Sequence, residues 1–258
     1  MPRFAANLSL MFTEHPFLDR FEAAARAGFR AVEFLFPYDH PAEAIAERLE
    51  ANGLTQALFN LAPGDWAKGE RGLAALPERH AEMRAGFEAA LPYIRATGVP
   101  QVHLMAGLTD RSATADRAFR EAITWHAERL AAEGVTLLLE PLNTRDNPGY
   151  HLASFDEAAD LIRDLALPNL KLKFDLYHCQ ILHGNVTRRL EAMMPLVGHV
   201  QVASVPSRHE PDGEELNHPY LFALLDRLGY PGWVGLEYRP RAGTVRGLGW
   251  LRRDEAPP

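Results

Sequence analysis

Four oxygen-bearing side chains close apolar runs in the second half of the chain: Glu140, Asp175, Gln201 and Glu237. They lie 35, 26 and 36 residues apart, and each gap is about one strand–helix unit of roughly 30 residues. We therefore expect one of them at the end of each of four successive strands. Three carboxylates that meet in a poorly solvated place repel one another unless they take up protons or a cation lies between them. The sequence thus predicts a divalent metal ion held by these four residues.

All four ligands offer oxygen, which suits a hard cation, so we expect Mg2+, with Mn2+ as the alternative. Four protein ligands leave two positions of an octahedral ion for two neighbouring substrate oxygens. Glu140 and Glu237 reach this place from different strands. One can therefore remove a proton from a substrate carbon while the other returns one to the next carbon. The predicted chemistry is an isomerisation of the aldose–ketose type, with Glu140 and Glu237 as catalytic residues.

Short apolar runs alternate with longer amphipathic stretches along the whole chain. The expected strands are Phe4–Ser9, Ala31–Phe36, Thr55–Asn60, Gln101–Ala106, Thr136–Glu140, Leu170–Asp175, His199–Ala203 and Trp233–Glu237. The expected helices are Pro16–Ala27, Pro41–Ala51, Pro77–Ala96, Ala115–Ala132, Ser154–Leu165, Asn185–Met194 and Pro219–Leu228. Ser154 and Glu157 have the spacing of a capping box at a helix start. Eight strands that alternate with helices indicate a parallel sheet.

The length of 258 residues is typical of a (β/α)8 TIM barrel. An open dinucleotide-binding sheet is disfavoured, because no G-x-G-x-x-G motif follows the first expected strand. We predict an α/β fold, a single TIM barrel domain over residues 1–258, with a C-terminal tail from about residue 240. In such barrels the C-terminal ends of the strands carry the active site, and the four predicted ligands fall there.

The composition of the chain limits the classes of partner that we expect. A formal net charge of −7 disfavours general binding to nucleic acid or to an anionic membrane. Cys179 is the only cysteine, so neither an internal disulfide nor a cysteine-based zinc cluster is expected. No signal-peptide pattern opens the sequence, and no apolar run approaches the length of a membrane span. We expect a cytoplasmic protein with a small-molecule substrate and no nucleic-acid or membrane partner, and a homo-oligomer is compatible with the sequence.

The strand-end residues stand in longer motifs: Glu140-Pro141-Leu142-Asn143, Phe174-Asp175-Leu176-Tyr177-His178, Gly198-His199-Val200-Gln201 and Gly235-Leu236-Glu237-Tyr238. Together they resemble the hydroxypyruvate isomerase family of xylose-isomerase-like barrels. So do Gly64–Gly72, Arg208–Pro211 and Gly247–Trp250, and the resemblance extends over nearly the whole chain. It implies reversible conversion of hydroxypyruvate and tartronate semialdehyde, or isomerisation of a close 2-oxo acid such as 2-oxotetronate. That reaction would belong to carbohydrate and glyoxylate metabolism.

In this family the residues that match Glu140 and Glu237 are metal ligands and proton donors or acceptors, and those that match Asp175 and Gln201 complete the metal site. The chain departs from the family pattern elsewhere, at Ser204, Ser207, His151, His218 and Arg239. These departures bear on the choice of substrate and leave the four ligands unchanged.

Four further residues are predicted to bind substrate. His178 follows Asp175 on the segment that leaves the sixth expected strand, and it could bond a substrate hydroxyl. Arg208, after the seventh strand, could pair with a substrate carboxylate, although pairing with a nearby loop acid is the alternative. Trp66 and Arg71 lie in a glycine-rich loop that could close over the site and exclude water.

Other functions on the same barrel remain as alternatives. A ketose 3-epimerase would use the same two glutamates but usually has a histidine in place of Gln201. An endonuclease of this barrel type needs several zinc ions and many histidine ligands, and the strand ends hold few histidines. A metal-free binding barrel would have little reason to keep three acidic residues at one mouth.

Overall fold

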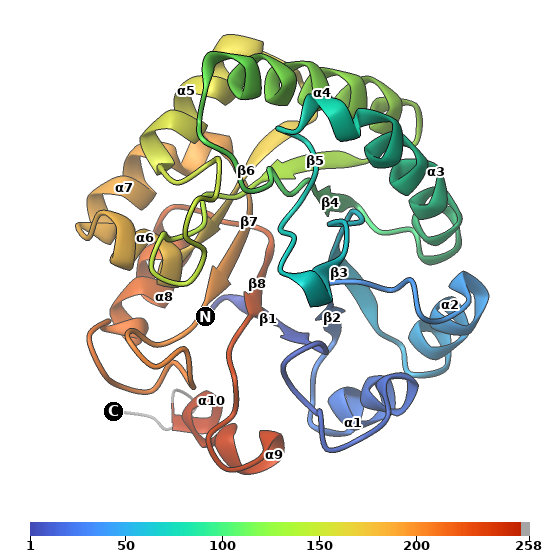
Figure 1. Ribbon diagram of the computed structural model, residues 1–258. Coiled ribbons are helices and arrows are strands. Elements are labelled where there is room, and N and C mark those ends of the chain that lie inside the picture. Colours follow the sequence, from blue (N-terminus) through green and yellow to red (C-terminus); the bar gives the residue numbers. More distant parts are fainter. Residues whose placement is uncertain (254–258) are drawn as a thin grey trace.

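The computed structural model describes residues 1–253, with side chains up to Leu251. Eight parallel strands pair in sequence order and close into a barrel, and the helices form a ring around it (Figure 1). The strands are β1 (Arg3–Asn7), β2 (Ala31–Glu33), β3 (Thr55–Asn60), β4 (Gln101–His103), β5 (Thr136–Leu139), β6 (Leu170–Asp175), β7 (Val197–Val202) and β8 (Trp233–Leu236). The predicted TIM barrel is confirmed.

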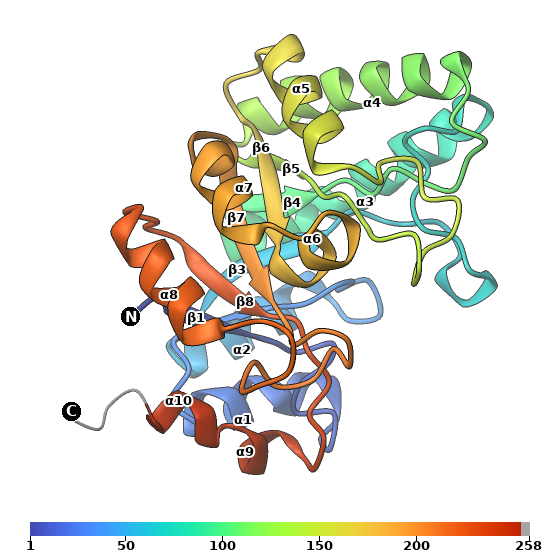
Figure 2. The same ribbon diagram turned by 90° about the vertical axis from the view of Figure 1, so that its left-hand side faces the viewer.

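The α-helices are α1 (Arg20–Arg26), α2 (Ala42–Ala51), α3 (His80–Thr97), α4 (Ala113–Ala132), α5 (Phe155–Leu165), α6 (Leu176–Leu182), α7 (Val186–Met193), α8 (His218–Arg227), α9 (Thr244–Gly247) and α10 (Gly249–Arg253). Short 3-10 turns cover Phe17–Asp19, Trp66–Lys68, Pro77–Arg79 and Met194–Leu196. The side view shows the loops that follow the strands gathered at one end of the barrel (Figure 2).

Local sequence signals explain the helix ends. Ser154 caps α5, because its hydroxyl accepts a hydrogen bond from the backbone N–H of Glu157 at 3.3 Å. Only this half of the expected capping box forms, since the Glu157 carboxylate pairs with Arg111 instead. Gly98 ends α3 with a φ of +62°, a left-handed conformation that glycine adopts without a side-chain clash.

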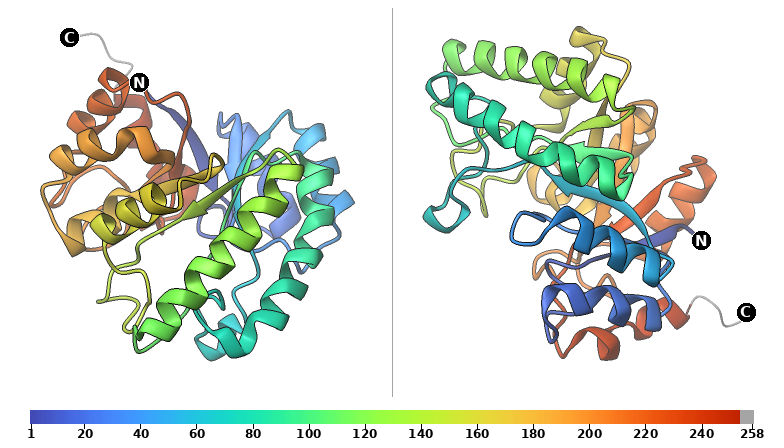
Figure 3. Two further views of the ribbon diagram at one scale, coloured as in Figure 1. Left: turned by 90° about the horizontal axis from the view of Figure 1, so that it is seen from above. Right: turned by 90° about the vertical axis from the view of Figure 1, so that its right-hand side faces the viewer.

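Two apolar regions hold the barrel together. The larger one is formed by buried residues of the strands and of the helices that cover their outer side. Figure 3 shows these helices lying along the outside of the strands. A small separate cluster of Ala5, Ala31 and Ala57, with Trp233 against it, lies on the other face of β1 to β3. Since neighbouring strand residues point to opposite faces, this cluster fills the narrow interior. Above it the interior becomes polar and charged.

All eight predicted strands and all seven predicted helices are present, and β3 and β6 have the predicted bounds. The expected C-terminal tail contains α9 and α10, which pack beside the first loop: the Phe12 backbone N–H donates to the Thr244 hydroxyl at 2.6 Å. The segment after Asp175, expected as a loop, is helix α6. Within residues 1–253, no helix combines the length and the apolar character that a membrane crossing requires.

Candidate active site

A cavity of about 270 Å³ opens at the C-terminal ends of the strands. Glu140, Lys173, His178, Arg208 and Glu237 are the main polar side chains in its wall. Asp175 and Gln201 are each 1% exposed and lie outside this lining. One oxygen of Asp175 lies within 4.8 Å of one of Glu140, and Asp175 stands opposite Gln201 on the neighbouring strand. The four strand-end residues are thus brought together at the C-terminal ends of the strands.

Two of the acids face a buried ammonium group. The Nζ atom of Lys173 lies 3.0 Å from Oε2 of Glu140 and 3.9 Å from Oε2 of Glu237. Lys173 is 1% exposed. The sequence-based prediction of a metal ion assumed that no cation of the chain lay among these carboxylates, and that assumption is wrong.

Asp175 begins helix α6 and is fixed by it. Its Oδ1 atom accepts a hydrogen bond of 2.7 Å from the backbone N–H of Tyr177, while Oδ2 lies 3.7 Å from Nε2 of His178. Glu140, Asp175 and His178 each place one potential ligand atom within 4.8 Å of the others. His178 nevertheless fits a donor role better than a ligand role. The backbone N–H of Asn143 donates to its Nδ1 at 3.0 Å, so the proton of the neutral ring is on Nε2.

Gln201 is held from the layer below. Its amide nitrogen donates to Oε1 of Glu33 at 2.6 Å, and Asn7 donates to the same oxygen at 3.0 Å. Nε2 of His199 lies 2.7 Å from the other Glu33 oxygen. The Glu33 carboxylate lies against Gly235 and leaves no room for a side chain there, because an added Cβ atom would lie 2.2 Å from Oε2 of Glu33. These contacts turn the Gln201 carbonyl oxygen away from Glu33, where it has no hydrogen-bond partner in the described structure.

Burial and mutual repulsion change how these acids titrate. Burial raises the pKa of Glu140 to about 8, with Glu237 and Asp175 adding to the rise and Lys173 opposing it. Burial and the Glu237 charge raise the pKa of Asp175 to about 6. Burial would also raise the pKa of Glu33, but its contacts with His199, Lys173 and Asn7 outweigh burial and lower that pKa.

The donor set fits a divalent metal ion. Oε1 of Glu140 and Oε1 of Gln201 are buried acceptors for which the described residues provide no hydrogen bond. Buried polar atoms are normally satisfied, so two such atoms at one mouth point to an additional group that they bind. Burial and the neighbouring acids raise the pKa values of Glu140 and Asp175, so the described residues stabilise the ionised forms of these acids poorly. A hard cation ligated by oxygen would remove both deficits.

Arg208 reaches the cavity from the loop after β7. Its Nη2 lies 3.3 Å from Oε1 of Glu237, its guanidinium lies 4.9 Å from the centre of the Tyr177 ring, and its buried Nε has no partner in the described chain. The loop acids that were its alternative partners, Glu210 and Asp212, pair with Arg241. One N–H of Arg208 is thus available for a substrate carboxylate, in agreement with its predicted role.

The glycine-rich loop after β3 contributes Trp66 to the cavity wall, where its ring packs against Phe36 at 5.1 Å. Arg71 is not among the lining residues. Its guanidinium stacks on Trp66 at 3.8 Å and donates to the backbone oxygen of Glu70 at 2.8 Å. Arg71 is therefore placed to support Trp66 rather than to touch a ligand in the cavity.

Several site residues were missed or underrated in the sequence. Lys173 was overlooked, although it precedes Asp175 by two positions on the same strand and so points to the same face. Asn7, Glu33 and His103 were not among the predicted site residues. Asn7 and Glu33 fix Gln201, and His103 lines the cavity with Nδ1 at 3.6 Å from Oε2 of Glu140.

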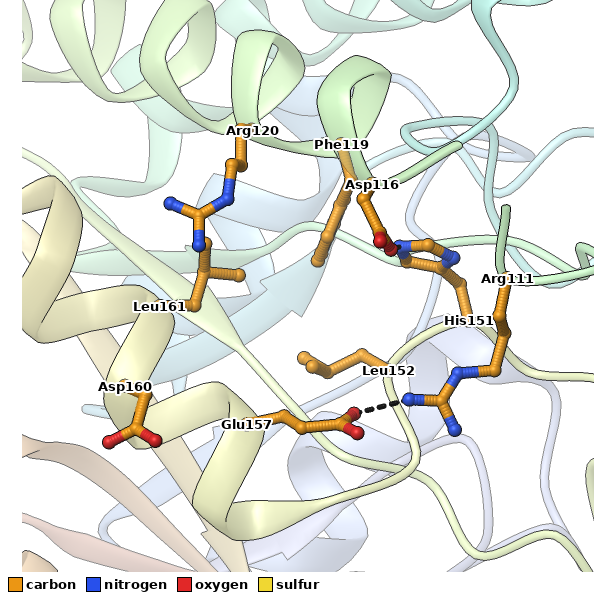
Figure 4. A pocket seen from close by; sticks show the side chains of 9 residues that line it. All are labelled: Arg111, Asp116, Phe119, Arg120, His151, Leu152, Glu157, Asp160 and Leu161. Atoms are coloured by element: carbon orange, nitrogen blue, oxygen red, sulfur yellow. Dashed lines mark hydrogen bonds and ion pairs between the residues drawn. The ribbon is translucent and has the colours of Figure 1, made fainter. Parts of the chain in front are cut away.

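A second hollow of about 350 Å³ lies between α4 and α5 (Figure 4). Its charged groups are matched in pairs: Arg111 with Glu157, and His151 with Asp116 at 3.4 Å. A third hollow, of about 560 Å³, is mostly apolar and is lined by residues such as Phe4, Trp233 and Leu248. Neither brings together the unpaired acceptors and carboxylates of the barrel mouth.

The chain is similar to known proteins over nearly its whole length. Residues 21–254 match the family described as xylose isomerase-like TIM barrel. The chain is 57% identical to the 2-oxo-tetronate isomerase of Cupriavidus necator, with 98% of each chain covered, and 42% identical to the hydroxypyruvate isomerase of Escherichia coli, covering 97% and 98%. A solved structure described as AP endonuclease, family 2, from Brucella melitensis is 51% identical, with a TM-score of 0.95 over 98% and 99% of the chains. D-psicose 3-epimerase from Clostridium cellulolyticum H10 shares the fold, with a TM-score of 0.76, 18% identity and coverage of 97% and 89%.

Proposed function

The chain belongs to the family of xylose isomerase-like TIM barrels and is an isomerase, as its motifs predicted, and we propose that it moves a carbonyl group between neighbouring carbons of a short 2-oxo acid. The observation that carries this proposal is the pairing of Glu140 and Glu237 about one cavity, with Lys173 between them. Two carboxylates on either side of a substrate can exchange protons with adjacent carbons.

Two substrates share this chemistry. Hydroxypyruvate and 2-oxo-tetronate both carry a carboxylate at C1, a carbonyl at C2 and a hydroxyl at C3, and they differ only in the substituent at C3. In both, loss of the C3 proton gives an enediolate across C2 and C3. A proton delivered to C2, together with transfer of the hydroxyl proton from the C3 oxygen to the C2 oxygen, completes the isomerisation. We rank 2-oxo-tetronate first because the relative with 57% identity carries that name, and hydroxypyruvate second because of the Escherichia coli relative.

The residues around the cavity have different roles in the proposed reaction. In the forward direction one glutamate takes the proton from C3 and the other gives one to C2, and the two exchange roles in reverse. Arg208 pairs with the substrate carboxylate through its free N–H. His178, whose pKa burial lowers well below its ordinary value, stays neutral and offers its Nε2 proton to a substrate oxygen.

A divalent ion, Mg2+ by preference, is part of the proposal. Glu140, Asp175, Gln201 and Glu237 would hold it, and when bound it would acidify the substrate C–H by drawing electron density from the adjacent oxygens. Two of the supporting observations are the unpaired buried oxygens of Glu140 and Gln201. The third is the raised pKa of the acids around them.

The name of the Brucella melitensis relative suggests a different activity, that of an endonuclease. The mouth of this barrel contains one cluster of potential ligands among the described residues, Glu140, Asp175 and His178. Its cavity of about 270 Å³ suits a small acid. The net charge of −7 also opposes DNA binding. We therefore favour the isomerase reaction.

Proton exchange with solvent tests this function directly. The purified protein is incubated with 2-oxo-tetronate or hydroxypyruvate and Mg2+ in D2O, and the products are followed by NMR. We expect deuterium at C3 of recovered substrate and at C2 of the isomerised product, and loss of both signals in Glu140→Gln and Glu237→Gln. Turnover of neutral sugars alone would contradict the acid substrate, and no exchange with any of these compounds would contradict the isomerase mechanism.

A further inference from the structure

Lys173 is placed in the site by the alternation of side chains along β6. It stands two positions before Asp175, so both side chains point to the same face of the strand. The register of β6 and β7 shifts below it, with Gly198 as the extra residue on β7, and regular pairing resumes with Lys173 opposite His199 and Asp175 opposite Gln201. Lys173 thus lies in the wall of the active-site cavity, where it is 1% exposed.

The lysine faces two carboxylates in the cavity wall. Its ammonium lies 3.0 Å from Oε2 of Glu140 and 3.9 Å from Oε2 of Glu237. We also assign both of these carboxylates to the metal ion. The chain's own cation and a divalent ion thus draw on the same negative charge.

We propose that Lys173 weakens the binding of the divalent ion and strengthens the binding of the acidic substrate. Lys173 would thereby set the ratio of the two affinities. Replacing Lys173 by a neutral residue adds one unit of negative charge to the site. A divalent cation gains from that change and an anion loses from it, because both interactions are strong in a buried place. This inference rests on the metal site of the proposed function.

Opposite changes in two affinities distinguish this role from a merely structural one. A lysine needed only for folding would, when replaced, loosen the site toward both ligands. Lys171 provides a matched control, because it stands two positions earlier on β6 and is partly exposed, with Nζ directed at the backbone oxygen of Pro195 at 3.4 Å.

The test measures Mn2+ binding by calorimetry, and then pyruvate binding at saturating Mn2+, in the wild type, Lys173→Gln, Lys173→Met and Lys171→Gln. Pyruvate has the acid and carbonyl groups but no C3 hydroxyl, so it binds without being isomerised. We expect Lys173→Gln to bind Mn2+ at least ~10-fold more tightly and pyruvate at least ~10-fold more weakly, and Lys171→Gln to match the wild type. Lys173→Met should behave like Lys173→Gln.

Thermal unfolding with and without Mn2+ keeps the test informative if Lys173→Gln folds poorly without metal. The variant should then gain more in melting temperature from Mn2+ than the wild type does. Equal affinities, a change in only one ligand, or weaker binding of both would overturn the proposal. If no variant binds Mn2+ at all, the metal site fails together with this inference, whereas the isomerase reaction is judged separately by deuterium exchange.

Discussion

Replacing Gly235 by alanine should damage the proposed metal site from a distance. The added Cβ atom would lie 2.2 Å and 2.4 Å from the two carboxylate oxygens of Glu33. Glu33 cannot move aside freely, because Asn7, Gln201 and His199 hold it at 3.0, 2.6 and 2.7 Å. The clash is therefore relieved only by breaking buried hydrogen bonds to a charged group.

The structure allows the size of this effect to be estimated. Overpacking of a buried site costs about 1–3 kcal/mol, and a hydrogen bond to a charged group contributes about 1.5–3 kcal/mol. Because a shift of Glu33 would reduce the overpacking but weaken its hydrogen bonds, the two costs do not simply add. We expect Gly235→Ala to lower the free energy of unfolding by about 2–4 kcal/mol. For a chain of this size, that corresponds to a fall in melting temperature of about 5–15 °C.

Urea denaturation and Mn2+ calorimetry measure the two consequences. Besides its lower stability, Gly235→Ala should bind Mn2+ at least ~10-fold more weakly, because Glu33 no longer fixes the amide of Gln201. Gly213→Ala is the matched control, since a methyl group there meets nothing within 4 Å, and it should stay within about 0.5 kcal/mol of the wild type. Wild-type stability and metal affinity in Gly235→Ala would refute the proposed support of Gln201 by Glu33.

Three further results are expected. The pKa of Glu140 (about 8) and that of Asp175 (about 6) are raised above the ordinary values near 4, so the chain takes up protons when it folds. Without metal, protonation of these two acids therefore stabilises the folded state fully below about pH 4. That stabilisation is lost as the pH rises through 6 and 8. Urea midpoints in EDTA should therefore fall over this range more steeply in the wild type than in Glu140→Gln, and parallel curves would contradict the assignment. Arg208→Lys keeps the charge but loses the planar fork that reaches Glu237, so KM for the acid should rise about 10-fold or more with a smaller change in kcat, and an unchanged KM would exclude Arg208 from substrate binding. His178→Gln should leave the Mn2+ affinity within about twofold while it lowers kcat/KM about 10-fold or more, whereas a large loss of Mn2+ affinity would make His178 a ligand.

The fold was predictable because its signals are local. Leu137, Leu138 and Leu139 form an apolar run that is fully buried in β5, as expected for a strand with both faces covered. Strand ends were predicted less accurately where buried apolar residues continue beyond the strand. Phe34 and Leu104 extend the apolar patterns of β2 and β4 past the ends of these strands, and both are buried in the larger core.

The site was predictable in its membership but not in its charge balance. Spacing alone identified the four strand-end residues, because one strand–helix unit separates each from the next. The argument from repulsion then assigned all the compensating charge to a metal ion. It missed Lys173 because each strand was judged by its last residue, whereas side chains two positions apart share a face.

The hydrogen-bonding roles of two groups in the site, the Gln201 amide and the His178 imidazole, are not fixed by their own chemistry. An amide can present either oxygen or nitrogen, and a neutral imidazole can carry its proton on either ring atom. In each case a neighbour of fixed character decides. Glu33, ionised and therefore only an acceptor, takes the nitrogen of Gln201 and leaves its oxygen for the proposed cation. The backbone N–H of Asn143, only a donor, takes Nδ1 of His178 and leaves an Nε2 proton for a substrate oxygen. The ligand set is therefore determined as much by the residues behind it as by the four residues that the sequence displays.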